Sequence, residues 1–377
     1  LSEGGDCRQD SQSKADESMA TSLPDLKIGD LTINPPIIQG GMGVRVSGSS
    51  LASAVSNEGA LGVIASVGVG EEWPDQSLDY ATRSELGFRE MIRQTMDATV
   101  NPVGVNIMCV LTNYESLVRV ADEEGVAAII TGAGLPLKLP ALVKNPNVKL
   151  IPIVSSGRAA DVICKSWAKK HGRLPDAVVV EGPLAGGHLG FSREQVDKPE
   201  EFRVERLVAE VAAVVGSHGQ AGNVEIPVIA AGGVYDGKDI ARFLKLGAAG
   251  VQMATRFVCT HECDAAPAYK EAYLRCTADD VVVINSPVGL PGRVVRNRFV
   301  ERVLAGERVP FRCTYHCLAT CDPKTAPYCI AAALINAYRG NLDGGFAMCG
   351  TNADRIDKIV SVRELIDELV EETAREL

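Results

Sequence analysis

The sequence lacks the features that mark membrane, secreted and nucleic-acid-binding proteins. No apolar run in its 377 residues reaches the roughly 18 to 20 residues that a membrane-spanning helix needs. A charged start followed by an apolar stretch, as in a signal peptide, is also missing. The formal net charge is −10 and no basic stripe is present, so no face could release counterions from a polyanion. We therefore expect a soluble cytoplasmic protein that binds neither membranes nor nucleic acids.

The chain also lacks the pattern of a disulfide framework. Its eleven cysteines are an odd number, and several, such as Cys109 and Cys164, fall in stretches typical of core strands or helices. This distribution indicates reduced thiols. Residues 1–20 are polar and rich in Ser, Asp and Gln, and we interpret them as a disordered leader or an expression remnant, with Met19 as a candidate native start.

What is present, from residue 35 onward, is a regular alternation of short β-branched runs with longer amphipathic segments. The runs are almost continuously apolar, as expected for parallel strands that are covered on both faces. Predicted strands span residues 36–40, 61–66, 102–108, 127–132, 149–154, 177–182, 226–233 and 249–257. Predicted helices span residues 47–59, 83–99, 114–125, 136–145, 157–172, 201–219 and 236–247. Eight strand–helix units predict an α/β fold, a (β/α)8 TIM barrel over residues 21–257.

The alternative is an open doubly wound sheet of the Rossmann or flavodoxin type. Its first turn would carry a GxGxxG motif, and an acidic residue would close the second strand. Here the first turn is "QGGMGVRVSG", which lacks both. This difference favours the barrel.

The regularity fails after the eighth strand. We expect residues 258–350 to form an irregular, Cys-rich insertion or subdomain over the barrel, in which residues 277–299 make a hairpin or loop that returns to the mouth of the site. A last helix at about 352–375, within a C-terminal segment 351–377, should pack on the barrel as its eighth helix. Its charged run is typical of a solvated face, and a homodimer contact is the alternative.

Active sites of such barrels lie at the carboxyl ends of the strands, where two loops here suit a phosphate. "AAGGVYDGKDI" sends Gly232 and Gly233 into a helix start, which offers backbone N–H groups to an anion. "QMATRF" adds Thr255 beside it. The alternative is that the two glycines only make a tight turn.

A phosphate site of this kind can hold a sugar phosphate, a nucleotide or flavin mononucleotide (FMN). "GGMG" at 40–43 lets the backbone approach a flat ring while Met42 packs against it. Asn106 supplies an amide that can both donate and accept at a heterocycle edge, and "TGAG" at 131–134 adds a further backbone cradle. A planar cofactor edged by amides favours flavin.

The chain resembles the nitronate monooxygenase (formerly 2-nitropropane dioxygenase) family of FMN-dependent barrels. The segments that carry the resemblance are "PPIIQGGMG", "GVNIM", "ITGAGLP", "VVVEGPLAGGHLG", "IPVIAAGGVYDG" and "GAAGVQMATRF". The resemblance spans about residues 30–260. The same superfamily contains FMN-dependent enoyl-acyl-carrier-protein reductases and some NADH:quinone reductases. The resemblance therefore implies an FMN-dependent TIM barrel.

The resemblance also implies roles for individual residues. It assigns Gly41, Met42 and Gly43 to the flavin ring, Asn106 to its polar edge, Gly187 to the flank of the ring, and Gly232, Gly233, Met253, Ala254 and Thr255 to the phosphate and ribityl end. Gln252 and Glu181 are expected to contact the ribityl chain or the residues around it. For Glu181 the alternative is a carboxylate held by nearby backbone. His188 is the active-site histidine that the resemblance implies.

The function expected from this resemblance is oxidation of alkyl nitronates by O2 to a carbonyl compound and nitrite. A near-neutral imidazole at position 188 could take a proton α to a nitro group, or hold an anion as imidazolium. Leu189 is a departure, because monooxygenases of the family often carry arginine there. An NAD(P)H-dependent FMN reductase acting on an enoyl thioester or quinone is the alternative, and a non-redox phosphate-binding barrel is a third class.

Four cysteines in the insertion follow an unusual spacing. Cys313, Cys317 and Cys321 recur every four residues and Cys329 follows. Zinc sites usually show paired C-x2-4-C knuckles and iron–sulfur runs prefer two-residue gaps. We interpret the four as structural thiols and assign no metal site. Metal or cluster binding and a redox or substrate-binding thiol are the alternatives.

Overall fold

The structure is a computed structural model that describes residues 23–377, so the predicted leader over residues 1–20 lies outside the described residues. Its central strands are β3 (Ile37–Gln39), β4 (Gly62–Ala65), β5 (Val103–Met108), β6 (Ala128–Gly132), β7 (Lys149–Val154), β8 (Val178–Glu181), β10 (Val228–Ala231) and β11 (Gly250–Met253). These eight strands form one parallel sheet in the order β3-β11-β10-β8-β7-β6-β5-β4. A parallel bridge between Ile38 and Leu61 joins its two ends. The predicted TIM barrel is confirmed.

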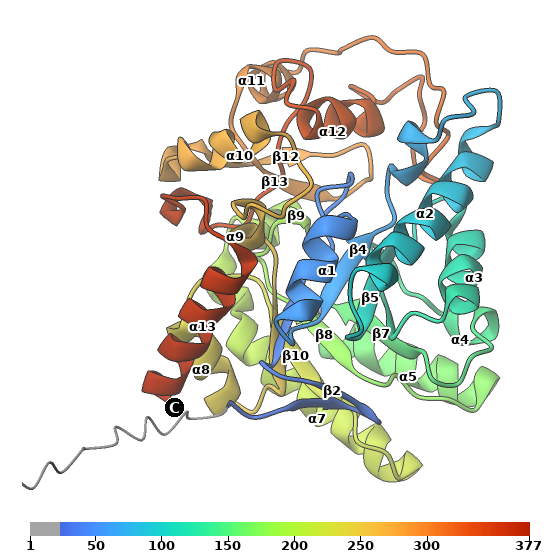
Figure 1. The fold of residues 1–377 in the computed structure, drawn as a ribbon, viewed down its shortest axis with the longest axis vertical. Coiled ribbons are helices and arrows are strands. Elements are labelled where there is room, and N and C mark those ends of the chain that lie inside the picture. The colour runs from blue at the N-terminus through green and yellow to red at the C-terminus, as the bar shows by residue number, and fades with distance from the viewer. Residues whose placement is uncertain (1–22) are drawn as a thin grey trace, which may run out of the picture.

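Helices surround the barrel (Figure 1). They are α1 (Ser49–Asn57), α2 (Tyr80–Asp97), α3 (Tyr114–Glu124), α4 (Leu139–Leu142), α5 (Gly157–His171), α7 (Val204–Gly222), α8 (Gly237–Lys245) and α13 (Val362–Glu376). The helix expected over residues 136–145 is only the short α4. Pro140 is tolerated because it lies in the first turn, and Pro146 disfavours helical backbone at the residue before it.

Apolar side chains fill the inside of the barrel and its amino end. Ile38, Val63, Ile130, Ile151, Val179 and Ile229 are among the buried residues of this inner core. A hairpin of β1 (Leu26–Ile28) and β2 (Leu31–Ile33) packs Leu26 and Ile28 into the same core. The amino end of the barrel is therefore closed, and the opposite rim is left for a site.

The chain between β11 and α13 forms several smaller elements, many of which lie above the barrel in Figure 1. They are α9 (Thr255–Val258), α10 (Pro267–Leu274), η3 (Ala278–Asp280), β12 (Val281–Asn285), β13 (Pro291–Val295), α11 (Arg298–Leu304), α12 (Ile330–Tyr338) and η4 (Ala353–Arg355). The loops before them contain η1 (Val69–Glu72), β9 (Gly187–His188), α6 (Arg193–Val196) and η2 (Pro199–Phe202). The hairpin expected over residues 277–299 is β12–β13, and β13 pairs antiparallel with β9.

The last helix begins later than predicted. Helix α13 starts at Val362, ten residues after the expected start at about 352, because Ser361 and Glu364 form a reciprocal capping box there. It packs against α8 and α1. None of the helices within residues 23–377 combines the length and apolar character that crossing a membrane requires.

The start of α1 is capped from a distant part of the chain. Its N-cap residue, Gly48, offers no side chain. The carboxylate of Asp264 instead accepts hydrogen bonds from the N–H groups of Gly48, Ser50 and Leu51 at 2.9, 3.2 and 3.1 Å. Burial raises the pKa of Asp264, and these three hydrogen bonds act in the opposite direction. Asp264 thus fastens the segment after β11 to the first barrel helix.

We predict that Asp264→Ala lowers the free energy of unfolding by about 2 kcal/mol, because three N–H groups at the start of α1 lose their carboxylate acceptor. Urea denaturation measures the change. Asp367→Ala, which removes an exposed carboxylate from α13, serves as the control and should shift stability by less than about 0.5 kcal/mol. Equal shifts in the two variants would contradict the capping role.

Candidate functional site

A cavity opens at the carboxyl ends of the barrel strands, on the rim away from the β1–β2 hairpin. The structure brings all thirteen residues predicted for the site to its lining: Gly41, Met42, Gly43, Asn106, Glu181, Gly187, His188, Gly232, Gly233, Gln252, Met253, Ala254 and Thr255. No lysine or arginine is among the lining residues. Any anion in this cavity would therefore depend on backbone and neutral side-chain donors.

One wall of the cavity is formed by the loop after β3 and the end of β5. A Cβ atom at Gly41 would lie 2.5 Å from the Cβ of Asn106, so only glycine permits this approach of the two segments. The loop is held by Ser47, whose hydroxyl accepts a hydrogen bond from the N–H of Met42 at 2.9 Å. The first predicted loop is thus a packed wall that places Met42 at the cavity.

A neighbouring wall comes from the ends of β10 and β11. Gly232 has a φ of +93°, and a Cβ there would lie 3.0 Å from the carbonyl oxygen of Gly182 in the loop after β8. Beyond it, the N–H groups of Gly233, Val234 and Ala254 have no hydrogen-bond partner within the described residues. They are free backbone donors beside the cavity, which suits an anionic group.

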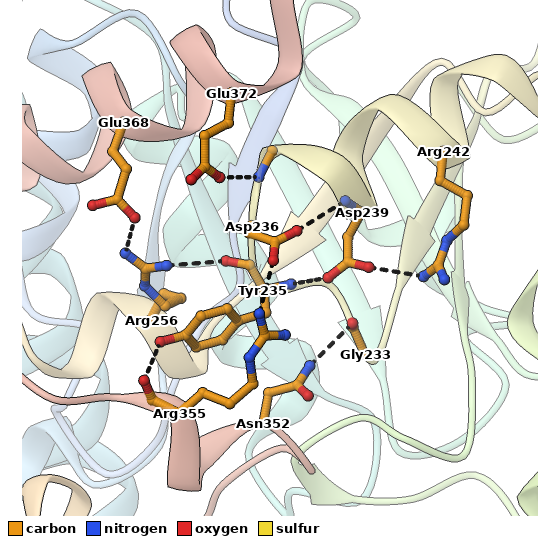
Figure 2. A network of polar contacts seen from close by, with 11 residues as sticks. Gly233, Tyr235, Asp236, Asp239, Arg242, Arg256, Asn352, Arg355, Glu368 and Glu372 are labelled. Atoms are coloured by element: carbon orange, nitrogen blue, oxygen red, sulfur yellow. Dashed lines mark hydrogen bonds and ion pairs between the residues drawn. The ribbon is translucent and has the colours of Figure 1, made fainter. Parts of the chain in front are cut away.

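The start of α8 offers fewer free N–H donors than the sequence suggested. Carboxylates of the protein already occupy it, as Figure 2 shows. Asp236 accepts from the N–H of Asp239 at 3.1 Å, and Asp239 accepts from the N–H of Tyr235 at 2.9 Å. Glu372 of α13 accepts from the N–H of Gly237 at 2.9 Å. The free N–H groups therefore precede the helix.

A segment before η4, Met348–Asn352, forms a further part of the lining that the sequence reasoning missed, together with Tyr269 and Leu334. The side-chain amide of Asn352 donates to the carbonyl of Gly233 at 3.1 Å (Figure 2). The hydroxyl of Thr255 accepts from the N–H of Gly350 at 2.9 Å. No sequence motif marks this segment, because its place depends on contacts with residues about a hundred positions away.

His188 lies on β9, at the cavity and next to the β12–β13 hairpin. Its Nε2 atom is 2.8 Å from the hydroxyl oxygen of Ser286, which directly follows β12. Burial lowers the pKa of His188 to about 4. The imidazole is therefore neutral at neutral pH, which fits proton transfer and does not fit the suggested imidazolium that holds an anion. Ser286 was not predicted from the sequence.

Glu181 ends β8 and lines the same cavity. Burial raises the pKa of its carboxyl to about 8, and the positive charge of Arg293 partly opposes this shift. Arg293 lies on β13, is only 5% exposed, and donates to the carbonyl of Ala185. No hydrogen bond to the Glu181 side chain is found in the described part of the chain, so backbone does not hold this carboxylate.

Leu189 carries less information about the reaction than the sequence suggested. Its side chain is fully buried in the core outside the barrel strands and does not line the cavity. Its N–H donates to the carbonyl of Pro291 at 2.9 Å, which extends the pairing between β9 and β13. Leu189 therefore supports the hairpin and does not face a substrate.

A closed eight-stranded parallel barrel with a glycine-rich cavity at its carboxyl rim defines a TIM-barrel enzyme. The family model described as nitronate monooxygenase matches residues 25–372. The chain belongs to the nitronate monooxygenase family, whose members are oxidoreductases.

The chain is similar to the following two relatives and two solved structures. A Mycobacterium tuberculosis protein named (3aS,4S,5R,7aS)-5-hydroxy-7a-methyl-1-oxo-octahydro-1H-indene-4-carboxyl-CoA dehydrogenase is 32% identical over 73% of this chain and 67% of its own. A probable nitronate monooxygenase of Staphylococcus aureus is 28% identical over 72% and 78%. FabK from Thermotoga maritima is 31% identical, with a TM-score of 0.70 over 90% and 93% of the two chains. Nitroalkane oxidase from Streptomyces ansochromogenes, at 21% identity, shares the fold, with a TM-score of 0.68 over 90% and 96%.

The neutral His188, half-buried at the cavity, predicts a pH dependence of stability. The pKa of the His188 imidazole is about 4 in the folded protein, whereas 6.5 is the usual value for a histidine exposed in an unfolded chain. The unfolded chain therefore binds the proton more tightly. The free energy of unfolding should therefore fall as pH drops from about 6.5 to about 4, by up to about 3 kcal/mol from this group.

Urea denaturation of the wild type and His188→Gln across this pH range isolates the effect, because other titrating groups are common to both proteins. The variant should lose about 3 kcal/mol less than the wild type. His261→Gln, at an exposed position, is the control and should follow the wild type. Parallel curves for the wild type and His188→Gln would contradict the burial of a neutral imidazole.

Proposed function

We propose that this chain is an FMN-dependent oxidoreductase that oxidises alkyl nitronates with O2 to a carbonyl compound and nitrite. The observation that carries the proposal is the neutral His188, held by Ser286 at a cavity whose other walls are rich in glycine. The family and the probable nitronate monooxygenases among the relatives support the reaction type.

Two independent features of the cavity support FMN as its ligand. First, free N–H groups at Gly233, Val234 and Ala254 provide neutral donors for a phosphate. Second, the Oε1 atom of Gln252 is buried at the cavity without a hydrogen-bond partner within the described residues. An orphaned buried acceptor costs free energy unless a ligand donor reaches it, and hydroxyls of a ribityl chain are such donors.

We assign the lining residues to parts of this cofactor. Gly41, Met42, Gly43, Asn106 and Gly187 would surround the ring; Gln252 and Glu181 would face the ribityl chain; Gly232, Gly233, Met253, Ala254 and Thr255 would surround the phosphate end. When bound, FMN would accept electrons from the substrate and pass them to O2. The protein itself supplies orientation, exclusion of water and a proton acceptor.

His188 would act as the proton acceptor when the substrate enters as a neutral nitroalkane. A neutral imidazole can take a proton from the carbon next to the nitro group, whereas an imidazolium cannot. The hydrogen bond between its Nε2 and Ser286 fixes the ring against rotation.

A second candidate is an NAD(P)H-dependent FMN reductase acting on an enoyl thioester or a quinone. The 32% identity to a protein named as a carboxyl-CoA dehydrogenase favours this alternative. The same neutral imidazole could exchange a proton next to a thioester carbonyl.

An anaerobic mixing experiment distinguishes the two candidates. We predict that propionate 3-nitronate bleaches the flavin absorbance of the purified protein within seconds, and that NADH and NADPH leave it unchanged, because the proposed reaction takes its electrons from the nitronate. Stopped-flow absorbance measures both. Fast bleaching by the nicotinamide alone would overturn the nitronate assignment in favour of the reductase.

The histidine has a separate test. His188→Asn should retain FMN and slow turnover of neutral nitroalkanes at least about tenfold, in line with the loss of a general base. Turnover of the preformed nitronate should fall less, because that substrate has already lost its proton. His261→Asn, at an exposed position in residues 258–350, is the matched control and should leave both rates unchanged. Equal rates for wild type and His188→Asn on the neutral substrate would show that the histidine is structural only.

A further inference from the structure

His188 and Ser286 form a hydrogen-bonded pair in the wall between two hollows of the molecule. His188 lines the cavity at the barrel rim, whereas Ser286 is not among its lining residues. Ser286 instead lines an open groove outside the β12–β13 turn, together with Asn285 and the segments 190–193 and 289–291. The Nε2 atom of His188 and the Oγ atom of Ser286 are 2.8 Å apart. One ring nitrogen of the histidine is therefore held from outside the cavity.

The turn between β12 and β13 fixes the hydroxyl of Ser286. The N–H of Ser286 donates to the carbonyl of Leu290 at 3.2 Å, which closes the turn. The Oγ atom accepts a hydrogen bond from the N–H of Val288 at 3.3 Å. The carbonyl of Val288 in turn accepts from the hydroxyl of Thr320 at 3.1 Å, so the chain after α11 braces the turn. Because Ser286 is only 8% exposed, its hydroxyl has a defined place before any ligand binds.

The other ring nitrogen of His188, Nδ1, is turned to the cavity. The Cδ2 edge of the ring faces β13, because a Cβ atom at Gly292 would lie 3.9 Å from Cδ2. The opposite edge of the ring carries Nδ1. Within residues 23–377 no hydrogen-bond partner of Nδ1 is found, and this nitrogen is not among the atoms sealed from solvent. Nδ1 is thus the nitrogen that a ligand in the cavity can reach.

The two possible tautomers of His188 differ in how well their N–H groups are paired. A neutral imidazole carries its proton on only one of the two nitrogens. If Ser286 donated to Nε2, the proton would be on Nδ1, and an N–H group would face the cavity without an acceptor from the described part of the chain. If Nε2–H donates to Ser286, the one N–H group of the ring is paired. Unpaired N–H donors are rarer in folded proteins than unpaired acceptors, which favours the second tautomer.

We propose that Ser286 is a positioning residue that selects the Nε2–H tautomer of His188 and thereby makes Nδ1 the base. The inference rests on the proposed role of His188 as a proton acceptor. The two lone pairs of the Ser286 hydroxyl accept from Nε2–H and from the N–H of Val288. The hydrogen of the hydroxyl is left for solvent in the groove that Ser286 lines.

This arrangement defines the path of the proton when a neutral nitroalkane reacts. Nδ1 of His188 takes the proton from the carbon next to the nitro group, and the electron pair of the C–H bond stays on the substrate, which becomes a nitronate. The imidazole becomes an imidazolium. Its hydrogen bond from Nε2–H to Ser286 then strengthens, because a charged donor makes a stronger hydrogen bond than a neutral one. Ser286 loses no proton in this step and does not touch the substrate.

Nuclear magnetic resonance of the purified protein, with isotopically labelled histidine, reads the tautomer directly, because protonated and unprotonated ring nitrogens have well-separated chemical shifts. The signals of His188 are those that are missing from His188→Gln. We expect the wild type at neutral pH to carry the proton on Nε2 and none on Nδ1. A wild-type His188 that is protonated on Nδ1 would overturn the proposal, and this result does not depend on the folding of a Ser286 variant.

Three serine variants test whether Ser286 selects the tautomer. Ser286→Ala removes the acceptor of Nε2–H, so the Nδ1–H form should appear beside the Nε2–H form. Ser286→Thr keeps the hydroxyl and should retain the tautomer of the wild type. Ser192→Ala is the matched control, because Ser192 lines the same groove and its hydroxyl accepts from the N–H of Gln195. An unchanged tautomer in folded Ser286→Ala would show that Ser286 does not select it.

Steady-state kinetics separate positioning from substrate binding. Ser286→Ala should lower kcat for a neutral nitroalkane about fivefold and change KM less than about twofold, because the base loses a hydrogen bond and the substrate loses no contact. Turnover of the preformed nitronate should stay unchanged, and Ser286→Thr should restore kcat. A wild-type kcat in Ser286→Ala would contradict the positioning role.

The spectroscopic result is independent of the reaction, because it needs no substrate. A protein that shows the expected tautomer, loses it in Ser286→Ala and oxidises no nitroalkane would support the selection by Ser286 and contradict only the proposed function.

Discussion

The closed parallel hydrogen-bond ladder of the barrel is the constraint on which the rest of the structure depends. Once Ile38 bridges to Leu61, no strand has a free edge, and all eight strands point their carboxyl ends to one rim. Loops that are far apart in the sequence must therefore meet there. The cavity follows from this closure, because the β1–β2 hairpin and the inner core fill the other end.

The chain after β11 supplies the residues that complete the candidate site at this rim. Pairing of β13 with β9 brings Arg293 opposite Gly187, and it places the turn with Ser286 next to His188. On the other side, the network in Figure 2 joins the loop after β10 to α13 and to the segment around η4. Residues from 258 onward therefore complete the walls that the barrel loops begin.

Much of the fold was predictable because its signals are local. Each barrel strand is a short apolar run, and all eight observed strands lie within the predicted ranges. The predicted elements differ from the structure where a short local pattern sets an element boundary or where a distant residue decides the structure. The S-x-x-E pattern at Ser361 marks the start of α13, and the alternation in "LKIGDLTI" marks the β1–β2 hairpin. No such pattern could show that Glu372 caps the start of α8, or that Asp264 caps α1.

The barrel, the family and the glycine, amide and imidazole groups on the loops at the rim can all be recognised in the sequence alone. Periodicity and motif spacing are properties of residues that are close in the sequence, so they can be recognised without a structure. The protonation and hydrogen bonding of those groups depend on the folded structure. Burial makes His188 neutral and raises the pKa of Glu181, and contacts across about a hundred residues supply Ser286 and Arg293. Protonation and hydrogen bonding depend on what surrounds a side chain in space, and that is set by packing between distant segments.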